Sequence, residues 1–325
     1  CHRYCLHKNL NIGVQGAGYG GGQPKSGLIH GPELIRGSGF IQFLVDEVGH
    51  DIKDYGDLTF DETRDKSPTI VEGCVPLNNV GSISRANFQI YESTRKILSD
   101  NRVPLTLGGD HSISIGTLAA VSEARQDIGI LWVDAHADLN TPYTTNSGNL
   151  HGLPMGFHVK ELAHDFKCLA TQFNWLVPRI PAKNIAYIGL REIGGRFNPK
   201  AQRENIKRLG IKTYTMGDVD RLGICEVTKQ ALDHVSLGGS RPVHLSFDVD
   251  SMDDFEIGSC TGTSVVGGLT LREALTLLEM CHGHLVSADF VEANPLLGDP
   301  ESRQRTADIC KHLLGAMWGY RRAGL

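Results

Sequence analysis

The chain has 325 residues, which is long enough for two domains or for one large α/β domain. Its 32 Lys and Arg residues against 37 Asp and Glu residues give a formal net charge of -5, so it lacks the basic excess of proteins that bind nucleic acids or anionic membranes. Apolar residues make up 40% of the chain, which is enough to build a core and excludes general disorder. We therefore expect a folded protein with no nucleic-acid partner and no membrane partner.

Cysteine usage and apolar run lengths bear on the compartment. No stretch approaches the roughly 20 consecutive apolar residues of a membrane-spanning helix. The 8 cysteines are scattered and too few for a disulfide scaffold in a chain of this length, so free thiols in a reducing compartment are expected. A cytoplasmic location is expected, with the mitochondrion as the alternative, because the chain begins at Cys1 and a targeting peptide could precede it. Residues 1–8 are expected to form a flexible segment, although their cysteines and histidines could chelate a soft metal.

Apolar runs and helical patterns alternate along the chain. The runs, nearly continuous in Val, Ile and Leu, predict strands buried on both faces of a parallel sheet at 10–14, 103–107, 128–133, 184–188, 243–247 and 285–290. Helices are predicted at 113–123, 201–209, 225–237, 271–280 and 303–319. This alternation indicates an α/β fold with a doubly wound, mostly parallel sheet that has helices on both faces. No repeat or linker marks a boundary, so we expect one domain over residues 9–325, with two domains as the alternative.

Acidic residues and histidines follow three of the predicted strands. The segments are Gly-Gly-Asp-His-Ser at 108–112, Asp-Ala-His-Ala-Asp at 134–138 and Asp-Val-Asp at 248–250. Alternate residues of an extended segment point to the same side, so Asp134, His136 and Asp138 are expected to converge. Open α/β sheets bind ligands beyond the carboxyl ends of their strands. These three segments are therefore the candidate functional site.

A cation is the simplest explanation for so many carboxylates, because ionised carboxylates repel one another and are costly to bury without a counter-charge. The candidate ligands are four carboxylates and two imidazoles: His111, Asp134, His136, Asp138, Asp248 and Asp250. Four negative charges match two divalent ions, and oxygen with imidazole favours Mn²⁺ over Zn²⁺, with Fe²⁺ and Co²⁺ as alternatives. A single Asp-x-Asp pair is more often part of a turn. The three segments together predict two Mn²⁺ ions per chain.

The same three segments resemble the signature motifs of the ureohydrolase superfamily, which contains the arginases and agmatinases. The run Asp-Leu-Asn-Thr-Pro-Tyr-Thr-Thr-Asn-Ser-Gly-Asn-Leu-His-Gly at 138–152 resembles the arginases in particular. Further similar segments, among them Ile-Gly-Leu-Arg at 188–191 and Glu-Ala-Asn-Pro at 292–295, extend the match over nearly the whole chain. The resemblance implies a parallel eight-stranded α/β fold, hydrolysis of L-arginine to L-ornithine and urea, and a homotrimer.

The resemblance also implies roles for individual residues. A metal-bridging hydroxide would attack the guanidinium carbon, and Asp138 would accept a hydrogen bond from it and relay a proton to the leaving amine. His151 resembles a proton shuttle, and Glu292 resembles the carboxylate that pairs with the guanidinium group. Asp138, His151 and Glu292 are thus the predicted catalytic residues. The predicted substrate contacts are His136, Asn140, Thr145, Ser147, Gly148, Asn149, Glu192, Thr263 and Glu292.

Three segments depart from the family pattern. After Arg191 the family has an acidic run that binds the substrate α-amino group, whereas this chain reads Glu-Ile-Gly-Gly-Arg-Phe at 192–197, and Glu192 or Glu204 could replace that contact. The loop at 251–260 lacks the family's prolines, and Gly18 stands where proline is usual. These departures leave two alternatives open. One is a hydrolase of another guanidine or amidine such as agmatine, and the other is a weakly active arginase-like binding protein.

Overall fold

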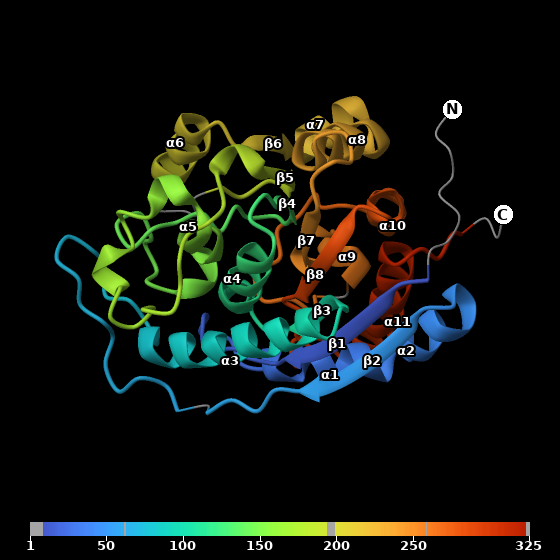
Figure 1. Cartoon of the computed structure of the whole chain (residues 1–325), viewed down its shortest axis with the longest axis horizontal. Helices are drawn as coiled ribbons and strands as arrows, with labels where there is room; N and C mark the ends of the chain where they lie inside the picture. Colours follow the sequence, from blue (N-terminus) through green and yellow to red (C-terminus); the bar gives the residue numbers. More distant parts are fainter. Residues whose placement is uncertain (1–8, 62, 194–198, 258, 323–325) are drawn as a thin grey trace.

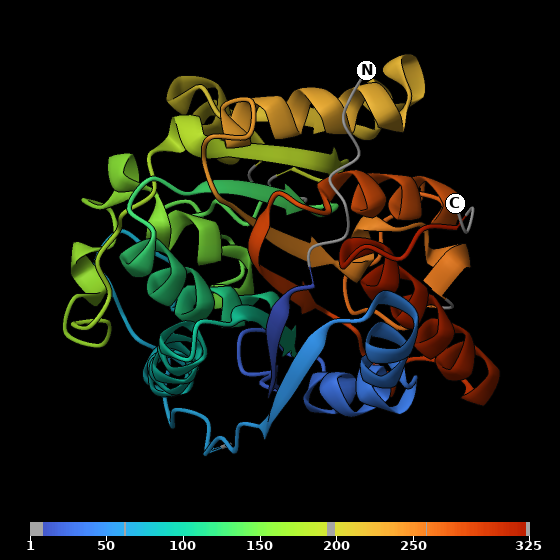
Figure 2. The same cartoon turned by 45° about the vertical axis from the view of Figure 1, so that its right-hand side comes forward.

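An eight-stranded parallel sheet runs through the molecule with helices on both faces (Figures 1 and 2). The computed structural model describes residues 9–61, 63–193, 199–257 and 259–322, so the segment 1–8 that we expect to be flexible lies outside them. The strand order is β2-β1-β3-β8-β7-β4-β5-β6, and every pairing is parallel. This arrangement confirms the predicted fold class. The strands are β1 Asn11–Ala17, β2 Asp51–Asp57, β3 Val103–Gly108, β4 Gly129–Val133, β5 Ile185–Leu190, β6 Lys212–Thr215, β7 Val243–Asp248 and β8 Leu285–Val291.

The six apolar runs correspond to β1, β3, β4, β5, β7 and β8, whereas the two edge strands have no such run. The sequence of β2 is Asp-Ile-Lys-Asp-Tyr-Gly-Asp, and most of its residues are exposed because nothing pairs with its outer edge. Strand β6 has only four residues, of which Tyr214 alone is buried. A search for continuous apolar residues finds strands that are buried on both faces, so it misses edge strands of this kind.

The helices form two layers. Helices α3, α4 and α5 pack on one face of the sheet, and α1, α2, α7, α8, α10 and α11 contribute to the core on the other face. The five predicted helices correspond to α4, α6, α8, α10 and α11 within a few residues at each end. The helices are α1 Gly31–Gly37, α2 Phe40–Phe43, α3 Val80–Ser99, α4 Ser114–Ala124, α5 Pro154–His158, α6 Pro199–Leu209, α7 Met216–Leu222, α8 Ile224–Ser236, α9 Asp254–Ile257, α10 Leu271–Cys281 and α11 Pro300–Met317.

Helix α3 is the long element that the sequence patterns do not predict. Its buried face contains polar residues, among them Ser82, Ser84, Asn87 and Thr94, which interrupt the apolar period of an amphipathic helix. These side chains are satisfied inside the molecule: the Asn87 side chain, for example, accepts a hydrogen bond from the amide of Gly116 at 2.7 Å. Close packing of α3 on α4 therefore depends on polar contacts as well as apolar ones.

Strand order explains why the candidate site forms. Strands β3, β8, β7 and β4 are neighbours in the middle of the sheet, and all point the same way. The segments 108–112, 134–138 and 248–250 follow β3, β4 and β7, and Glu292 follows β8. Residues that are about 180 positions apart in the chain thus meet at the carboxyl ends of the central strands, where open α/β sheets bind their ligands.

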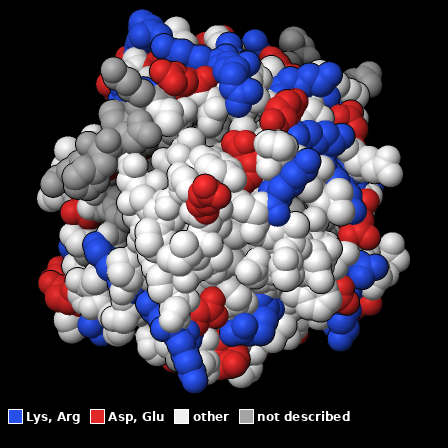
Figure 3. All heavy atoms as spheres, turned by 90° about the vertical axis from the view of Figure 1, so that its left-hand side faces the viewer, with Lys and Arg blue, Asp and Glu red and all other residues white. Residues whose placement is uncertain are grey.

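The surface seen from the side of α5 and α6 has no broad patch of one charge (Figure 3). Lys and Arg side chains lie mostly around the rim of this face together with Asp and Glu, and much of its centre carries neither kind.

Within the described ranges, no helix combines the length and apolar character needed to cross a bilayer.

The centre of the sheet should be the most sensitive part of the core. Leu245 lies in β7 between β4 and β8 and is fully buried. We expect Leu245→Ala to lower the free energy of unfolding by about 2–5 kcal/mol, because it removes a transfer contribution and leaves a cavity. Urea denaturation followed by circular dichroism measures this loss. Leu222→Ala, at an exposed position of α7, is the matched control, with an expected change below about 0.5 kcal/mol; equal losses would contradict the prediction.

Candidate functional site

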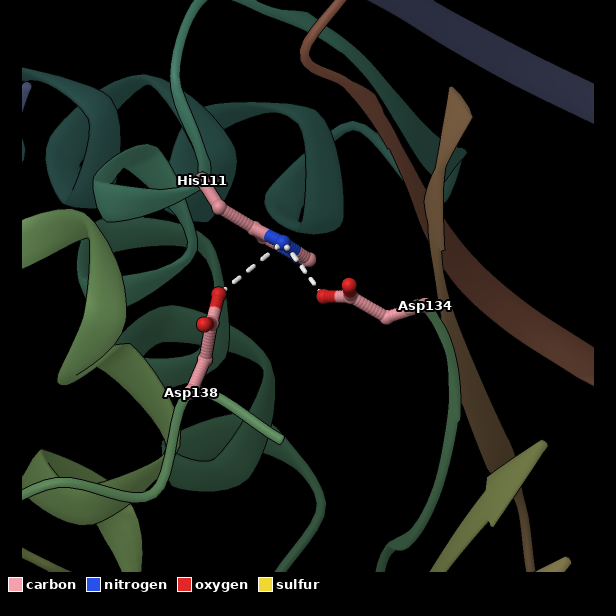
Figure 4. Close-up of side chains that lie close together, drawn as sticks. All are labelled: His111, Asp134 and Asp138. Carbon is pink, nitrogen blue, oxygen red and sulfur yellow. Dashed lines mark ion pairs between the residues drawn. The ribbon is translucent and has the colours of Figure 1, made fainter. Parts of the chain in front are cut away.

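The first group of predicted ligands gathers around the imidazole of His111. Its Nδ1 atom lies 3.1 Å from Oδ2 of Asp134 and 3.3 Å from Oδ2 of Asp138. The three side chains point toward one another (Figure 4). Oδ2 of Asp248 lies 3.0 Å from the same nitrogen. All four side chains are nearly inaccessible to solvent. One nitrogen and three carboxylate oxygens from three different strand ends therefore face a common point.

A second group adjoins the first and shares Asp134 with it. Nδ1 of His136 lies 3.4 Å from Oδ1 of Asp134 and 3.1 Å from Oδ2 of Asp250. The two oxygens of Asp134 thus face two different imidazoles. Five of the six predicted ligands thus form two neighbouring clusters that share Asp134, and the sixth, Asp248, lies beside His111 in the first group.

The pKa values of the clustered side chains indicate that the carboxylates need additional positive charge. Burial and repulsion by Asp134 raise the pKa of Asp138 to about 8. Burial and repulsion by Asp250 and Asp134 likewise raise the pKa of Asp248 well above its usual range. Burial lowers the pKa of His111, but contacts with Asp134 and Asp248 outweigh this effect and hold the pKa well above its ordinary value. Protons therefore supply counter-charge to this site, which divalent cations could supply instead.

The donor set passes a direct test for a metal site. Nδ1 of His111 is buried and makes no well-oriented hydrogen bond to any described residue, although three carboxylate oxygens lie within 3.3 Å of it. Its other ring nitrogen, Nε2, lies 2.8 Å from the hydroxyl of Ser246. In a metal-binding histidine, one ring nitrogen typically forms a hydrogen bond that fixes the ring, and the other ring nitrogen is available to bind the metal. Oxygen and imidazole ligands without thiolate suit Mn²⁺ and similar ions.

Neighbouring residues hold the clusters in shape. The indole of Trp132 stacks on the imidazole of His111 with a centroid distance of 4.1 Å, and its Nε1 donates to Oδ2 of Asp134 at 2.9 Å. The amide of His136 donates to Oδ1 of Asp134 at 2.7 Å. Sequence reasoning does not assign Trp132 or Ser246 to the site. Trp132 could be found from its position two residues before Asp134, which puts both side chains on one side of the strand.

Two functional residues have strained backbones. Asp138 has a φ of 46° and Glu292 a φ of 65°, in the left-handed region that non-glycine residues seldom adopt. Backbone contacts hold both in place: the Met155 amide donates to the Asp138 carbonyl at 3.1 Å, and the Glu292 amide donates to the Gly109 carbonyl at 2.8 Å. Strain of this kind, of order 1–3 kcal/mol per residue, is common where a side chain must be aimed at a ligand.

A cavity of about 310 Å³ opens above the clusters. Most of the predicted site residues reach its wall, together with three residues that are not predicted, Gly152, Gln202 and Ser264. Gln202 comes from α6 and is only 3% exposed. A lone glutamine in a helix carries no sequence signal, so only the fold reveals its place. The predicted residues on the wall are His136, Asp138, Asn140, Ser147, His151, Glu192, Asp248, Asp250, Thr263 and Glu292.

The remaining predicted residues lie beside or beneath the cavity. His111 and Asp134 form part of its buried base. Thr145, Gly148 and Asn149 are not on its wall, as the structure describes it. Oγ1 of Thr145 accepts a hydrogen bond from the Gly148 amide at 3.3 Å, and Oδ1 of Asn149 accepts one from Asn78 at 2.9 Å. These three residues therefore shape the loop that carries Asn140 and Ser147.

Glu292 is the most firmly held side chain on the cavity wall. Its Oε1 accepts a hydrogen bond from the His111 amide at 2.9 Å, and its Oε2 accepts one from Nε2 of Gln23 at 2.7 Å. Nδ1 of His151 lies 3.7 Å from Oε1 of Glu292. Burial lowers the pKa of His151, but the nearby Glu292 carboxylate outweighs this and raises it overall. A fixed carboxylate and a protonatable imidazole therefore stand side by side.

The segment 192–197, which departs from the family pattern, begins next to Arg191, whose side chain is fixed by hydrogen bonds. The side chain of Arg191 donates hydrogen bonds to the carbonyls of Asp250, Met252 and Val265 at 2.6, 3.1 and 2.7 Å, which ties the altered loop 251–260 to β5. Glu192 follows, with Oε2 at 3.8 Å from Nε2 of His136. Residues 194–198 lie outside the described part of the chain. Glu204 is exposed on α6 and is not on the cavity wall.

Comparison with known proteins agrees with this geometry. The model of the Arginase family matches residues 10–318. Arginase-1 of Homo sapiens is 40% identical over 320 residues, which cover 98% of this chain and 95% of the human protein. The solved arginase of Bacillus caldovelox has 32% identity and a TM-score of 0.83, covering 97% of this chain and 100% of its own. Entamoeba histolytica arginase in complex with L-ornithine has 27% identity and a TM-score of 0.77, covering 95% and 99%. The chain therefore belongs to the arginase family.

Proposed function

We propose that this protein is an arginase that hydrolyses L-arginine to L-ornithine and urea with two Mn²⁺ ions. The observation that carries the proposal is the pair of adjoining ligand clusters, which share Asp134 beneath a cavity that also presents Glu292 and His151. The relatives support it, since the human protein and the Bacillus structure are arginases and the Entamoeba arginase structure contains L-ornithine. A homotrimer, implied by the family resemblance, is part of the same proposal.

The two clusters divide the ligands between two ions. His111, Asp134, Asp138 and Asp248 would hold one ion. Asp134, His136 and Asp250 would hold the other. When bound, two divalent cations lower the pKa of water and so supply a nucleophile at neutral pH.

Glu292 would orient the reacting end of the substrate. Both of its oxygens are positioned by hydrogen bonds from His111 and Gln23, and each keeps capacity for a second donor. A guanidinium group offers paired N–H donors that match a carboxylate in a bidentate, charge-assisted contact. Held in this way, the trigonal guanidinium carbon faces the metal ligands at the base of the cavity.

Asp138 and His151 would move the protons. Attack on the guanidinium carbon yields a tetrahedral centre, and the carbon–nitrogen bond to the ornithine side breaks when that nitrogen gains a proton. Asp138 lies among the ligands beneath the cavity, where its carboxylate could accept a proton from the attacking water and pass it to that nitrogen. His151 is about 20% exposed at the cavity wall and can exchange protons with solvent. Urea and the free amine then leave.

The outer cavity would bind the amino-acid end. Asn140 and Ser147 offer hydrogen-bond donors to the α-carboxylate. Apart from the metal ligands and Glu292, Glu192 is the one acidic residue on the wall as described, so it is the group suited to the α-amino group. Gln202 adds an amide from α6. This polar end favours arginine over agmatine, which lacks the carboxylate.

The substrate comparison tests the proposal. Urea release from Mn²⁺-loaded protein should give a kcat/KM for L-arginine at least about 100-fold above that for agmatine, because agmatine lacks the carboxylate that would accept charge-assisted hydrogen bonds from Asn140 and Ser147. Steady-state rates at several substrate concentrations provide both values. A higher kcat/KM for agmatine would overturn the arginase assignment and favour another guanidine substrate.

Metal content separates ligands from other site residues. Dialysed wild-type protein should retain about two Mn²⁺ per chain by mass spectrometry of the metal. Asp134→Ala should lose most of both ions, since Asp134 belongs to both clusters. The matched variant His151→Asn should keep both ions while kcat falls by about 10²-fold or more. Metal loss in His151→Asn, or two ions in Asp134→Ala, would contradict these assignments.

Variants of Glu192 and Glu204 test which glutamate contacts the α-amino group of the substrate. Glu192→Gln should raise KM for L-arginine by about tenfold, because a charge-assisted contact is lost, and kcat should change less. Glu204→Gln is the matched control and should leave both constants within about twofold, since an isolated exposed charge contributes little. Initial-rate kinetics on both variants give the comparison, and a larger effect at Glu204 than at Glu192 would reverse the assignment.

A further inference from the structure

A second cavity lies on the other side of the loop that follows β1. Its volume is about 390 Å³, which is in the size range of small-molecule sites. Its walls come from residues 18–21, 25–30 and 58–60, with Arg64 and with Ser82 near the start of α3. None of these residues lines the cavity above the metal ligands. The proposed arginase reaction makes no use of this space.

The charged groups on its wall are basic. Lys25, His30 and Arg64 line it, and no Asp or Glu does within the described residues. Lys25 Nζ donates to the carbonyl of Gly262, and Arg64 Nη2 donates to the carbonyl of Gly20 at 3.4 Å. Neither cation forms an ion pair with a carboxylate in the described ranges, whereas His30 lies 3.7 Å from Glu33. Among the described residues, two cations thus line the cavity without a carboxylate partner.

The glycine-rich loop adds backbone donors. No described residue accepts a hydrogen bond from the amides of Gly20 and Gly21, although their carbonyls are both used. Gly18, where the family usually has proline, lets the backbone of Ile29 come close, since a Cβ at Gly18 would lie 2.5 Å from the Ile29 carbonyl oxygen. The departure from the family pattern therefore helps to build the wall of this cavity.

Apolar side chains complete the lining. Leu28 is fully buried, and Leu58 and Phe60 line the same space. The ring of Tyr19 meets that of Phe60 edge to face at a centroid distance of 5.5 Å, and its hydroxyl lies 2.7 Å from Oγ of Ser82. A ligand that fits must carry a negative group for the cations and amides and a compact apolar body for these side chains.

We propose that this cavity is a binding site for a small organic anion, a carboxylate or phosphate attached to a compact apolar group. The anionic group would lie against Lys25, Arg64 and the amides of Gly20 and Gly21. The apolar group would lie against Leu58 and Phe60, which Leu28 supports from behind. The site is separate from the metal centre, although the next two residues of the same loop contact residues near it: the Gly22 amide donates to Oδ2 of Asp110 at 2.6 Å, and Nε2 of Gln23 donates to Oε2 of Glu292 at 2.7 Å.

Calorimetric titration of the Mn²⁺-loaded protein with three probes of equal body tests the proposal. Benzoate and phenyl phosphate represent the two anionic groups, and benzamide is their neutral counterpart. We expect saturable binding of at least one anion with a stoichiometry of about one, and binding of benzamide that is weaker by about tenfold or more. The stronger of the two anions identifies the preferred group. Absence of saturable binding of both anions, or equal binding of benzamide, overturns the proposal.

Two matched arginine variants test whether Arg64 contacts the bound anion. Arg64→Gln should weaken binding of the preferred anion by about tenfold. Arg179→Gln is the control, because Arg179 likewise donates to one backbone carbonyl, that of Val177, and lines neither cavity. If Arg64→Gln does not fold by circular dichroism, Lys25→Met replaces it with the same expectation. Equal affinities of the Arg64 and Arg179 variants overturn the proposal.

A crystal of the protein soaked in 4-bromobenzoate provides an independent readout. The anomalous signal of bromine should lie beside Leu58 and Phe60. A bromine signal confined to the cavity between His136 and Glu292 would show that the probe binds at the metal centre instead, and would overturn the proposal.

Discussion

Four carboxylates, those of Asp134, Asp138, Asp248 and Asp250, share one buried space at the carboxyl ends of adjacent strands, and their mutual repulsion is the constraint on which the site depends. Such a group can persist only with counter-charge. Two imidazoles provide part of it and point their Nδ1 atoms at the carboxylates. The rest must come from protons or from cations, so divalent ions can take the place of protons in this space.

The scaffold gives this arrangement its rigidity. The ligands sit directly after β3, β4 and β7, and Glu292 sits directly after β8, so each begins from a strand that is hydrogen-bonded on both sides. Trp132 and Ser246 then fix the imidazole and carboxylate orientations from within the strands themselves. Placing a charged site on strand ends rather than on long loops limits the motion that would otherwise let the carboxylates move apart.

The sequence locates the two clusters of acidic residues and histidines because their signal is local. Alternation in Asp-Ala-His-Ala-Asp at 134–138 places three ligands on one side, and a buried strand precedes each segment. The signal for β2, β6 and α3 is weak, since edge strands and the polar buried face of α3 lack apolar periodicity. Gln202 on the cavity wall, and the loop role of Thr145, depend on contacts between distant segments, which no local pattern encodes.

The raised pKa values at the clusters also bear on how metal enters the protein. Because burial and repulsion raise the pKa values of Asp138 and Asp248, and contacts with carboxylates raise the pKa of His111, the site without metal favours bound protons. Ligands bind metal in their deprotonated forms, so each ion that enters must displace protons into the solvent. Loading is then an exchange reaction whose equilibrium shifts toward the ion as pH rises. The acidity of its surroundings, as much as the supply of the metal ion, would set the fraction of chains that carry a complete centre.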